Sequence, residues 1–402
     1  MSKTTTWRGF SERVLQIQPS MTMEVADRAK TLKSQGVEII DLSVGEPDFD
    51  TPDHIKQAAV KAMESGYTKY TKNVGMDELR EAVCAKFRRD NEMEYTPEEI
   101  IISSGGKHVL FNVMMALLNP GEEIIIFAPY WVTFTEMARL AGGEPVIITT
   151  KESMSYEPDI GRVRRAINPR TKAILINSPG NPTGAVYSED TIGALVDLAR
   201  EHGVFLISDE CYDRVTYNGR HVSPASLEGS PGLVITVQSV SKPYAMTGWR
   251  IGYGGANSEI IEQMAKIQSQ STSNANSIAQ YAAVEALTGA QSFIGEMVGE
   301  YRRRRDHTLG VLNRIPGVTC STPQGAFYVF PNIAQYYGHS YDGKTLSSSL
   351  DMSYYLLDET HVAVVPGGGF GADDHIRISY ATSMQELQRG MERIQLALEA
   401  LR

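Results

Sequence analysis

The chain has few cysteines and no long apolar run. Its three cysteines, Cys84, Cys211 and Cys320, lie far apart and form no CxxC pair. Neither a disulfide framework nor a metal site is therefore predicted, and a reducing compartment suits the chain. No stretch of about 18 apolar residues predicts a membrane span, and the N-terminus lacks the apolar core of a secretory signal. We therefore expect a soluble, cytoplasmic protein that does not bind membranes.

A basic excess is also missing. The 402 residues include 38 lysines and arginines against 48 aspartates and glutamates, which gives a formal net charge of −10. Nucleic-acid backbones select basic surfaces, so no nucleic-acid partner is expected. No G-x-G-x-x-G motif follows a first strand, which argues against a dinucleotide-binding enzyme. A small anion would need only a local basic pocket, and the acidic balance does not exclude one.

Short apolar segments alternate with helical ones in the middle of the chain, and the length suits two or three domains. The segments expected to be strands are 100–103, 123–127, 145–149, 172–177, 204–208 and 233–237. Their continuous rather than alternating apolar pattern is typical of a mostly parallel sheet with helices on both faces. We predict an α/β fold with a large domain at 51–315. Residues 1–50 and 316–402 are expected to form a smaller α+β domain, with strands at 37–44, 325–330, 362–365 and 376–380.

One lysine lies within a polar segment directly after the last of these strands. In Ser239-Val-Ser-Lys-Pro-Tyr-Ala-Met-Thr-Gly-Trp-Arg250, the two serines and the arginine offer hydroxyl donors and a charged, planar fork to a phosphate. Lys242 offers an amine nucleophile that can form a Schiff base. Together they suggest a lysine that carries pyridoxal 5′-phosphate. Taken alone, the segment is equally compatible with an ordinary surface loop.

Other polar residues follow the ends of predicted strands, where open α/β sheets bind ligands. Asp209 ends a buried strand, and a protonated pyridinium nitrogen would pair with its carboxylate. Gly106 and Lys107 begin a helix whose backbone N–H groups could reach a phosphate. Trp131 could stack on a pyridine ring or anchor the core. Asn181, in a proline-rich loop, could donate to a cofactor oxygen or cap a turn.

The order of these segments resembles that of the class I/II aminotransferases of fold type I. The matching segments are Ser104-Gly-Gly-Lys107, Pro129-Tyr-Trp131, Asn181-Pro-Thr-Gly184, Asp209-Glu-Cys-Tyr212, Ser239-Val-Ser-Lys242, Met246-Thr-Gly-Trp-Arg250 and Arg377-Ile-Ser-Tyr-Ala-Thr-Ser383. The resemblance extends from about Ser11 to the C-terminus and is strongest to the bacterial aspartate aminotransferases of the Iβ subgroup. It implies a large cofactor-binding domain with a mostly parallel sheet and a smaller α+β domain.

The resemblance implies a role for each matching residue. Lys242 corresponds to the Schiff-base lysine that moves the substrate proton, and Asp209 to the acid that keeps the pyridine nitrogen protonated. Tyr212 and Asn181 correspond to partners of the ring oxygen, and Trp131 to the stacking aromatic. The implied phosphate-binding residues are Gly106, Lys107, Ser239, Ser241, Arg250 and, from a neighbouring subunit, Tyr70. A homodimer with shared sites is therefore expected.

Substrate recognition follows from the same resemblance. Arg377 corresponds to the arginine that binds the substrate α-carboxylate, and Gly45 adds a backbone contact. Trp131 and Asn181 are expected to contact substrate as well as cofactor. Lys107 and Thr22 correspond to residues associated with the distal carboxylate of acidic substrates. Gln18 replaces a basic residue of the subgroup, and this loss of charge argues against prephenate.

The implied reaction is a ping-pong transfer of the amino group of L-aspartate, or another acidic amino acid, to 2-oxoglutarate. Alternatives on the same fold are an aminotransferase with aromatic, prephenate or other donors and a carbon–sulfur lyase. A regulator with a fused DNA-binding module is disfavoured, because the first 40 residues are too few for a winged helix.

Two further segments carry expectations. The basic run at 302–305 is expected to form a solvated helix face, and 366–371 could be a lid loop or a plain turn.

Overall fold

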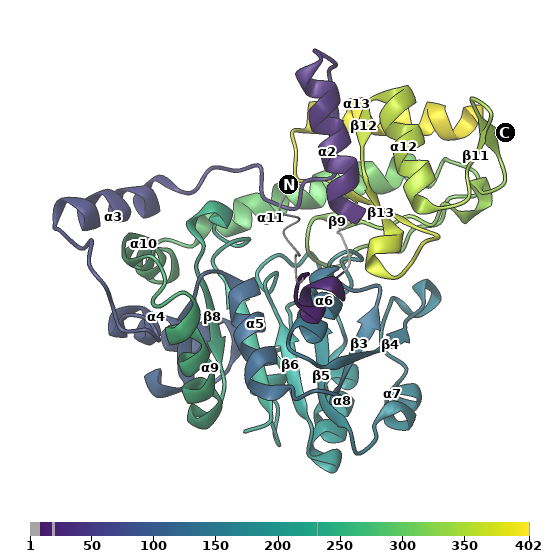
Figure 1. Ribbon diagram of the computed structural model, residues 1–402. Helices are drawn as coiled ribbons and strands as arrows, with labels where there is room; N and C mark the ends of the chain where they lie inside the picture. The colour runs from purple at the N-terminus through teal and green to yellow at the C-terminus, as the bar shows by residue number, and fades with distance from the viewer. Residues whose placement is uncertain (1–8, 18–20, 231, 402) are drawn as a thin grey trace, which may run out of the picture.

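The computed structural model describes residues 9–17, 21–230 and 232–401 (Figure 1). A seven-stranded sheet forms its centre, with the order β2-β8-β7-β6-β5-β3-β4. Its strands are β2 (Ile100–Ser103), β3 (Glu123–Ala128), β4 (Glu144–Thr149), β5 (Thr171–Asn177), β6 (Phe205–Asp209), β7 (Val234–Ser239) and β8 (Gly252–Gly255). Neighbouring strands are parallel except at β8, which is antiparallel to both β2 and β7. The mostly parallel sheet predicted from the sequence is confirmed.

Helices cover both faces of this sheet because successive strand residues point to opposite sides. Ile124 and Ile126 pack toward α5 (Gly106–Leu117), α6 (Thr133–Leu140) and α9 (Ser258–Ser271). Ile125 and Phe127 pack toward α7 (Ile160–Ala166) and α8 (Glu189–His202). A further core joins β2 and β8 to α3 (Asp53–Glu64), α4 (Asp77–Asn91) and α10 (Ser277–Thr288). The strand ends that carry the predicted site residues are thereby held rigidly.

A smaller group of elements lies above the carboxyl ends of the strands (Figure 1). Its three-stranded antiparallel sheet has the order β13 (Val365–Pro366), β14 (Ile376–Ser379) and β9 (Tyr328–Val329). The remaining strand pairs are β1 (Ile40–Asp41) with β12 (Val362–Ala363), and β10 (Ser340–Tyr341) with β11 (Lys344–Thr345). The accompanying helices are α2 (Met21–Ser34), α12 (Ser349–Thr360) and α13 (Met384–Ala400). The short helix α1 (Glu12–Leu15) instead contacts α6 of the large layer (Figure 1). Residues from both ends of the chain thus share one layer.

Several elements differ from the sequence-based expectation. The strands expected at 37–44 and 325–330 are only two residues long, as β1 and β9. β8 is absent from the expected strands because glycine, three of its four residues, is a poor strand former. The sequence analysis also leaves α6, α7, α9 and α10 unassigned. Close packing requires glycine at one position of β8, because a Cβ atom on Gly252 would lie 2.2 Å from Gly106 N.

The expected solvated face at 302–305 is wrong for two of its four arginines. These residues lie within α11 (Ser292–Leu312), and Arg304 and Arg305 are each only 6% exposed. Arg304 donates to Asp48 (2.8 Å), and Arg305 donates to the Pro323 carbonyl (3.0 Å). Four consecutive helical residues span most of a turn, so they cannot all face solvent on a packed helix.

We expect Gly252→Ala to lower the free energy of unfolding by about 2 kcal/mol, because the new methyl group would overlap the backbone of Gly105 and Gly106. Chemical denaturation of the purified protein measures this change. Gly193→Ala is the matched control: it lies inside α8 with no atom within 4 Å of the new methyl group, so a neutral or stabilising effect of up to about 1 kcal/mol is expected. Equal effects of the two substitutions would contradict the close approach of β8 and α5.

Candidate active site

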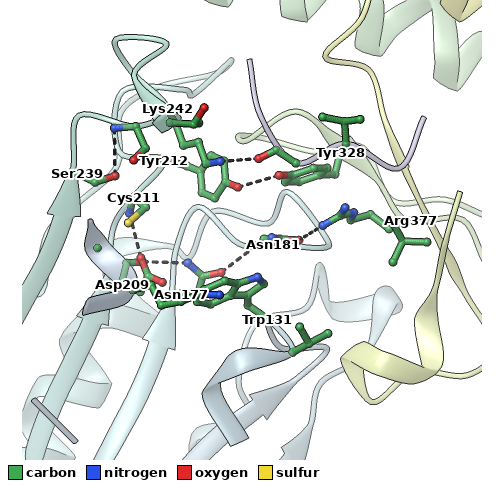
Figure 2. A pocket seen from close by; sticks show the side chains of 18 of the residues that line it. Trp131, Asn177, Asn181, Asp209, Cys211, Tyr212, Ser239, Lys242, Tyr328 and Arg377 are labelled. Atoms are coloured by element: carbon green, nitrogen blue, oxygen red, sulfur yellow. Dashed lines mark hydrogen bonds between the residues drawn. The ribbon is translucent and has the colours of Figure 1, made fainter. Parts of the chain in front are cut away.

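A cavity of about 510 Å³ lies at the carboxyl ends of β5, β6 and β7, beneath the smaller layer (Figure 2). It brings together most of the residues that the sequence predicts for the site. Those that line it are Gly45, Gly106, Lys107, Trp131, Asn181, Asp209, Tyr212, Ser239, Ser241, Lys242, Arg250 and Arg377. Tyr70 does not line the cavity and is 91% exposed. Thr22 belongs to α2, but its side chain and the whole of Gln18 lie outside the described residues.

Lys242 extends into the cavity from the turn that follows β7. Its Nζ donates to the Gly45 carbonyl and lies 5.9 Å from the centre of the Tyr212 ring. Burial lowers the pKa of this ammonium group to about 8, and the positive charges of Arg377 and Arg250 act in the same direction. A substantial fraction of Lys242 is therefore neutral near that pH, as an amine nucleophile or base requires.

Asp209 ends β6 with its side chain only 5% exposed. Oδ1 accepts a hydrogen bond from the Cys211 backbone N–H at 3.1 Å, and no cation forms an ion pair with this carboxylate among the described residues. Burial raises the pKa of Asp209 to about 6. A buried carboxylate favours a cationic partner, and the described part of the chain does not supply one.

Arg377 reaches the cavity from β14 and is 7% exposed. Nη1 donates to Asn181 Oδ1 (3.0 Å), and Nη2 donates to the Ser43 carbonyl (2.7 Å). Its Nε is buried without a hydrogen-bond partner within the described part of the chain. The guanidinium has no carboxylate partner there, so it remains available to an anion.

Tyr328 is a cavity residue that the sequence analysis missed. Its hydroxyl lies 2.8 Å from the Tyr212 hydroxyl, and the centre of its ring lies 4.4 Å from the Arg377 guanidinium carbon (Figure 2). The segment around it was predicted only as a strand. The tyrosine pair joins β9 in the smaller layer to the turn after β6, which no local sequence pattern could indicate.

The first turn of α5 lines the cavity with Gly106 and Lys107. Helix N-termini carry unpaired N–H groups and partial positive charge. Arg250 approaches so closely that a Cβ atom on Gly105 would lie 2.2 Å from its Nη2. Among the described residues, Arg250 donates hydrogen bonds to the carbonyl oxygens of Thr247 and Ser104 and forms no ion pair. Arg250 also has a left-handed backbone (φ 56°), a strained conformation that occurs often at functional sites.

Lys107 provides a second positive group at the cavity wall. Its Nζ lies 4.6 Å from the centre of the Trp131 ring, within range of a cation–π interaction. Burial, and secondarily the charge of Arg250, lowers the pKa of Lys107. No acidic residue forms an ion pair with it among the residues described. A negatively charged ligand would complete this environment.

Comparison with known families agrees with this geometry. Residues 37–394 match the family model described as aminotransferase class I and II. The chain belongs to this family. The sequence-based resemblance is therefore confirmed over nearly the whole chain.

Individual relatives support the same conclusion. The chain is 46% identical over 395 residues to a probable aspartate/prephenate aminotransferase of Thermus aquaticus, which covers 98% of this chain and 100% of the relative. It is 44% identical to an aspartate aminotransferase of Geobacillus stearothermophilus, covering 97% and 99% of the two chains. A solved aspartate aminotransferase of Thermus thermophilus with maleate has a TM-score of 0.92 and 45% identity, covering 97% and 100%.

The enzyme is a pyridoxal-phosphate-dependent aminotransferase, and its cavity fits that cofactor. The buried Asp209 lacks a cation, and the first turn of α5 with Arg250 offers a cradle for a phosphate. Lys242 faces the same space with a lowered pKa. No helix of the described residues is long and apolar enough to cross a membrane.

We expect Asp209→Asn to stabilise the cofactor-free protein in a pH-dependent way. The carboxyl pKa is about 6 when folded and about 3.9 when unfolded, so the unfolded state ionises first as pH rises. The wild type should therefore lose stability between about pH 4 and pH 6, by about 2–3 kcal/mol, while the asparagine variant does not. Unfolding measured at pH 4 and pH 7.5 tests this difference.

The exposed carboxylate of Glu228 provides the control, since Glu228→Gln should give no such difference between the two pH values. An advantage of Asp209→Asn that is the same at both pH values would contradict the raised pKa of Asp209.

Proposed function

We propose that this enzyme transfers the amino group of L-aspartate, or another acidic amino acid, to 2-oxoglutarate. The observation that carries the proposal is the pair of cations, Arg377 and Lys107, that face one cavity without carboxylate partners in the described chain. A substrate with two carboxylates matches two such cations. The names of the relatives from Geobacillus and Thermus agree, and the Thermus thermophilus structure contains maleate, a dicarboxylate.

In this proposal Arg377 binds the α-carboxylate. Its contact with Asn181 aims the guanidinium into the cavity, and Gly45 supplies a backbone contact on the same side. Lys107 binds the distal carboxylate, with Thr22 from α2 as a second contact. Trp131 lies beside Lys107 and limits the side-chain space as well as stacking on the cofactor.

Lys242 is the proposed base. Pyridoxal phosphate, when bound, supplies an electron sink for the electrons left at the substrate Cα. Lys242 Nζ, neutral above a pKa of about 8, accepts the Cα proton and holds it within the cavity for redelivery. The ping-pong sequence needs the same residues twice, first with the amino acid and then with the 2-oxo acid.

The remaining residues are proposed to hold the cofactor. Asp209 pairs with the ring nitrogen, and Tyr212 and Asn181 contact the ring oxygen. The phosphate is assigned to Gly106, Lys107, Ser239, Ser241 and Arg250. Both serines line the cavity, and the Ser241 N–H donates to the Ser239 hydroxyl oxygen at 3.3 Å, which restrains that hydroxyl group.

Prephenate is a second candidate substrate, because the relative from Thermus aquaticus is named for both substrates. Gln18, in place of a basic residue, argues against it. The two candidates differ in the group at the distal end of the substrate, so a donor and acceptor panel separates them.

A homodimer with shared sites is also proposed. Tyr70 is 91% exposed and Val60 and Met63 on α3 are exposed, although the segment itself is ordered by the stacking of Tyr67 on Tyr281. A second copy would cover these side chains and bring its own Tyr70 toward the phosphate site.

We expect aspartate and glutamate to be the best amino donors, and Lys107→Ala to lower kcat/KM for them by about 10- to 100-fold more than for alanine or phenylalanine. The reason is the loss of one charged contact to the distal carboxylate. Steady-state assays with each donor, and with 2-oxoglutarate or prephenate as acceptor, measure the effect.

Lys266→Ala, at an exposed lysine on α9, is the control and should change no donor. Faster transfer from neutral donors than from aspartate would refute the substrate assignment. Release of pyruvate and ammonia without an acceptor would indicate a lyase instead.

We expect a solution mass of two 44.3 kDa chains, and Tyr70→Phe should weaken pyridoxal phosphate binding about 3- to 30-fold through the loss of one hydrogen bond. Sedimentation gives the mass, and titration of cofactor-free protein gives the Kd. Tyr67→Phe, three residues earlier, is the matched control and should leave the Kd unchanged. A monomer with full cofactor affinity would rule out the shared site.

A further inference from the structure

A cluster of buried polar side chains lies behind the strand ends that border the cavity. Asp209 and Ser239, at the ends of β6 and β7, line the cavity. Their chain neighbours Glu210 and Gln238 are completely buried and do not line it. Successive residues of an extended chain point to opposite sides, so the two sets lie back to back. The mechanism proposed above uses only the cavity-facing set.

Lys86 is the cation of this cluster. It lies on α4, is 1% exposed and does not line the cavity. Its Nζ donates to Asn91 Oδ1 at 2.7 Å and also to Asp213 and Gln238. These acceptors belong to the end of α4, the turn after β6 and the end of β7. One ammonium group therefore joins three separate segments.

Gln238 links Lys86 to a second charged group. Its Oε1 accepts from Lys86, and its Nε2 donates to Glu210 Oε2 at 3.0 Å. Glu210 Oε2 also accepts from Ser223 Oγ at 2.6 Å and lies 3.2 Å from His221 Nε2. Burial opposes ionisation, but His221, Ser223 and Gln238 outweigh it and lower the pKa of Glu210. The amide of Gln238 is thus fixed between a cation and an anion.

The backbone shows what this cluster restrains. The ladder between β6 and β7 ends at the hydrogen bond from Glu210 N to the Val237 carbonyl (2.8 Å). Beyond it, the chain turns through Cys211 and Tyr212 to Asp213, with Asp213 N bonded to the Glu210 carbonyl at 3.0 Å. Lys86 contacts both Asp213 in this turn and Gln238 on β7, so it connects the turn to β7 beyond the last hydrogen bond of the ladder.

Stability alone is a poor explanation for such a cluster. Buried ion pairs often stabilise a fold no more than apolar side chains of similar size, because desolvation offsets their attraction. A role in fixing one arrangement of the strand ends accounts for the buried charges directly. Displacements on the order of 1 Å at a site are enough to impair binding and catalysis.

We propose that Lys86, Gln238 and Glu210 are positioning residues that hold Asp209, Tyr212 and Ser239 in place for the cofactor. They act from the opposite side of the sheet and touch neither substrate nor cofactor. This inference rests on the cofactor roles given to those three residues under the proposed function.

The test uses the double variant Lys86→Met with Asp213→Asn, which removes both charges of the central pair and leaves neither unpaired. We expect a melting temperature within a few degrees of the wild type, and a Kd for pyridoxal phosphate at least about tenfold higher. The pH midpoint of the bound cofactor's absorbance should shift by about half a unit or more, because the ring's partners move. Purified full-length protein, stripped of cofactor and titrated, provides all three readings.

Glu123→Gln is the matched control. Glu123 is a buried carboxylate at the start of β3, the opposite end of the sheet, where it accepts from Asn168 at 2.7 Å. Its substitution should lower the melting temperature without changing the Kd or the absorbance midpoint. Lost stability would thereby be distinguished from lost positioning.

Gln238→Met breaks both arms of the cluster without changing any charge, and should shift the Kd and the midpoint in the same way. The proposal is overturned if the folded double variant binds the cofactor with the Kd and absorbance midpoint of the wild type, because the cluster would then be merely structural. Where the double variant does not fold, the same result for Gln238→Met overturns it. A wild-type protein that binds no pyridoxal phosphate would instead refute the cofactor assignment itself, and this inference with it.

Discussion

The removal of the Asp209 carboxylate from water is the constraint on which the site depends. The same burial that makes the cofactor-free protein less stable near neutral pH favours a cationic partner for this carboxylate, the role proposed above for the protonated ring nitrogen. Burial disfavours the charged form of Lys242 as well, but here it lowers the pKa, to about 8, so that part of this residue is a neutral amine near that pH. Burial in one cavity thus raises the pKa of an ordinary aspartate and lowers the pKa of an ordinary lysine.

The two layers contribute different parts of this chemistry. The large sheet places Lys242, Asp209 and the first turn of α5 at the carboxyl ends of β7, β6 and β2, where open α/β sheets bind ligands. The smaller layer supplies Arg377 and Tyr328 from β14 and β9. The contacts of Arg377 with Asn181 and of Tyr328 with Tyr212 cross between the layers. The residues proposed to bind substrate and those proposed to bind cofactor are therefore linked by direct hydrogen bonds.

Sequence reasoning identified the sheet, its mostly parallel direction and half of the residues that line the cavity, because apolar strands and polar strand ends are local signals. β8 was missed because its glycines are selected for close packing against α5, a reason that lies in another part of the chain. Arg304 and Arg305 were wrongly expected to face solvent, because their charge alone does not reveal that they donate hydrogen bonds to Asp48 and to the Pro323 carbonyl. Tyr328 and Lys86 could not be identified for a similar reason, since the partners that define their roles, Tyr212 and Asp213, lie more than 100 residues away in the sequence.

The order in which the chain supplies the cavity has a consequence for its synthesis. Lys242 and Asp209 are made well before Arg377, which lies on β14 with only α13 after it among the elements described. A chain that ends before β14 would lack Arg377 and also the middle strand of the three-stranded sheet, so the cavity is complete only when β14 has joined its neighbours β13 and β9.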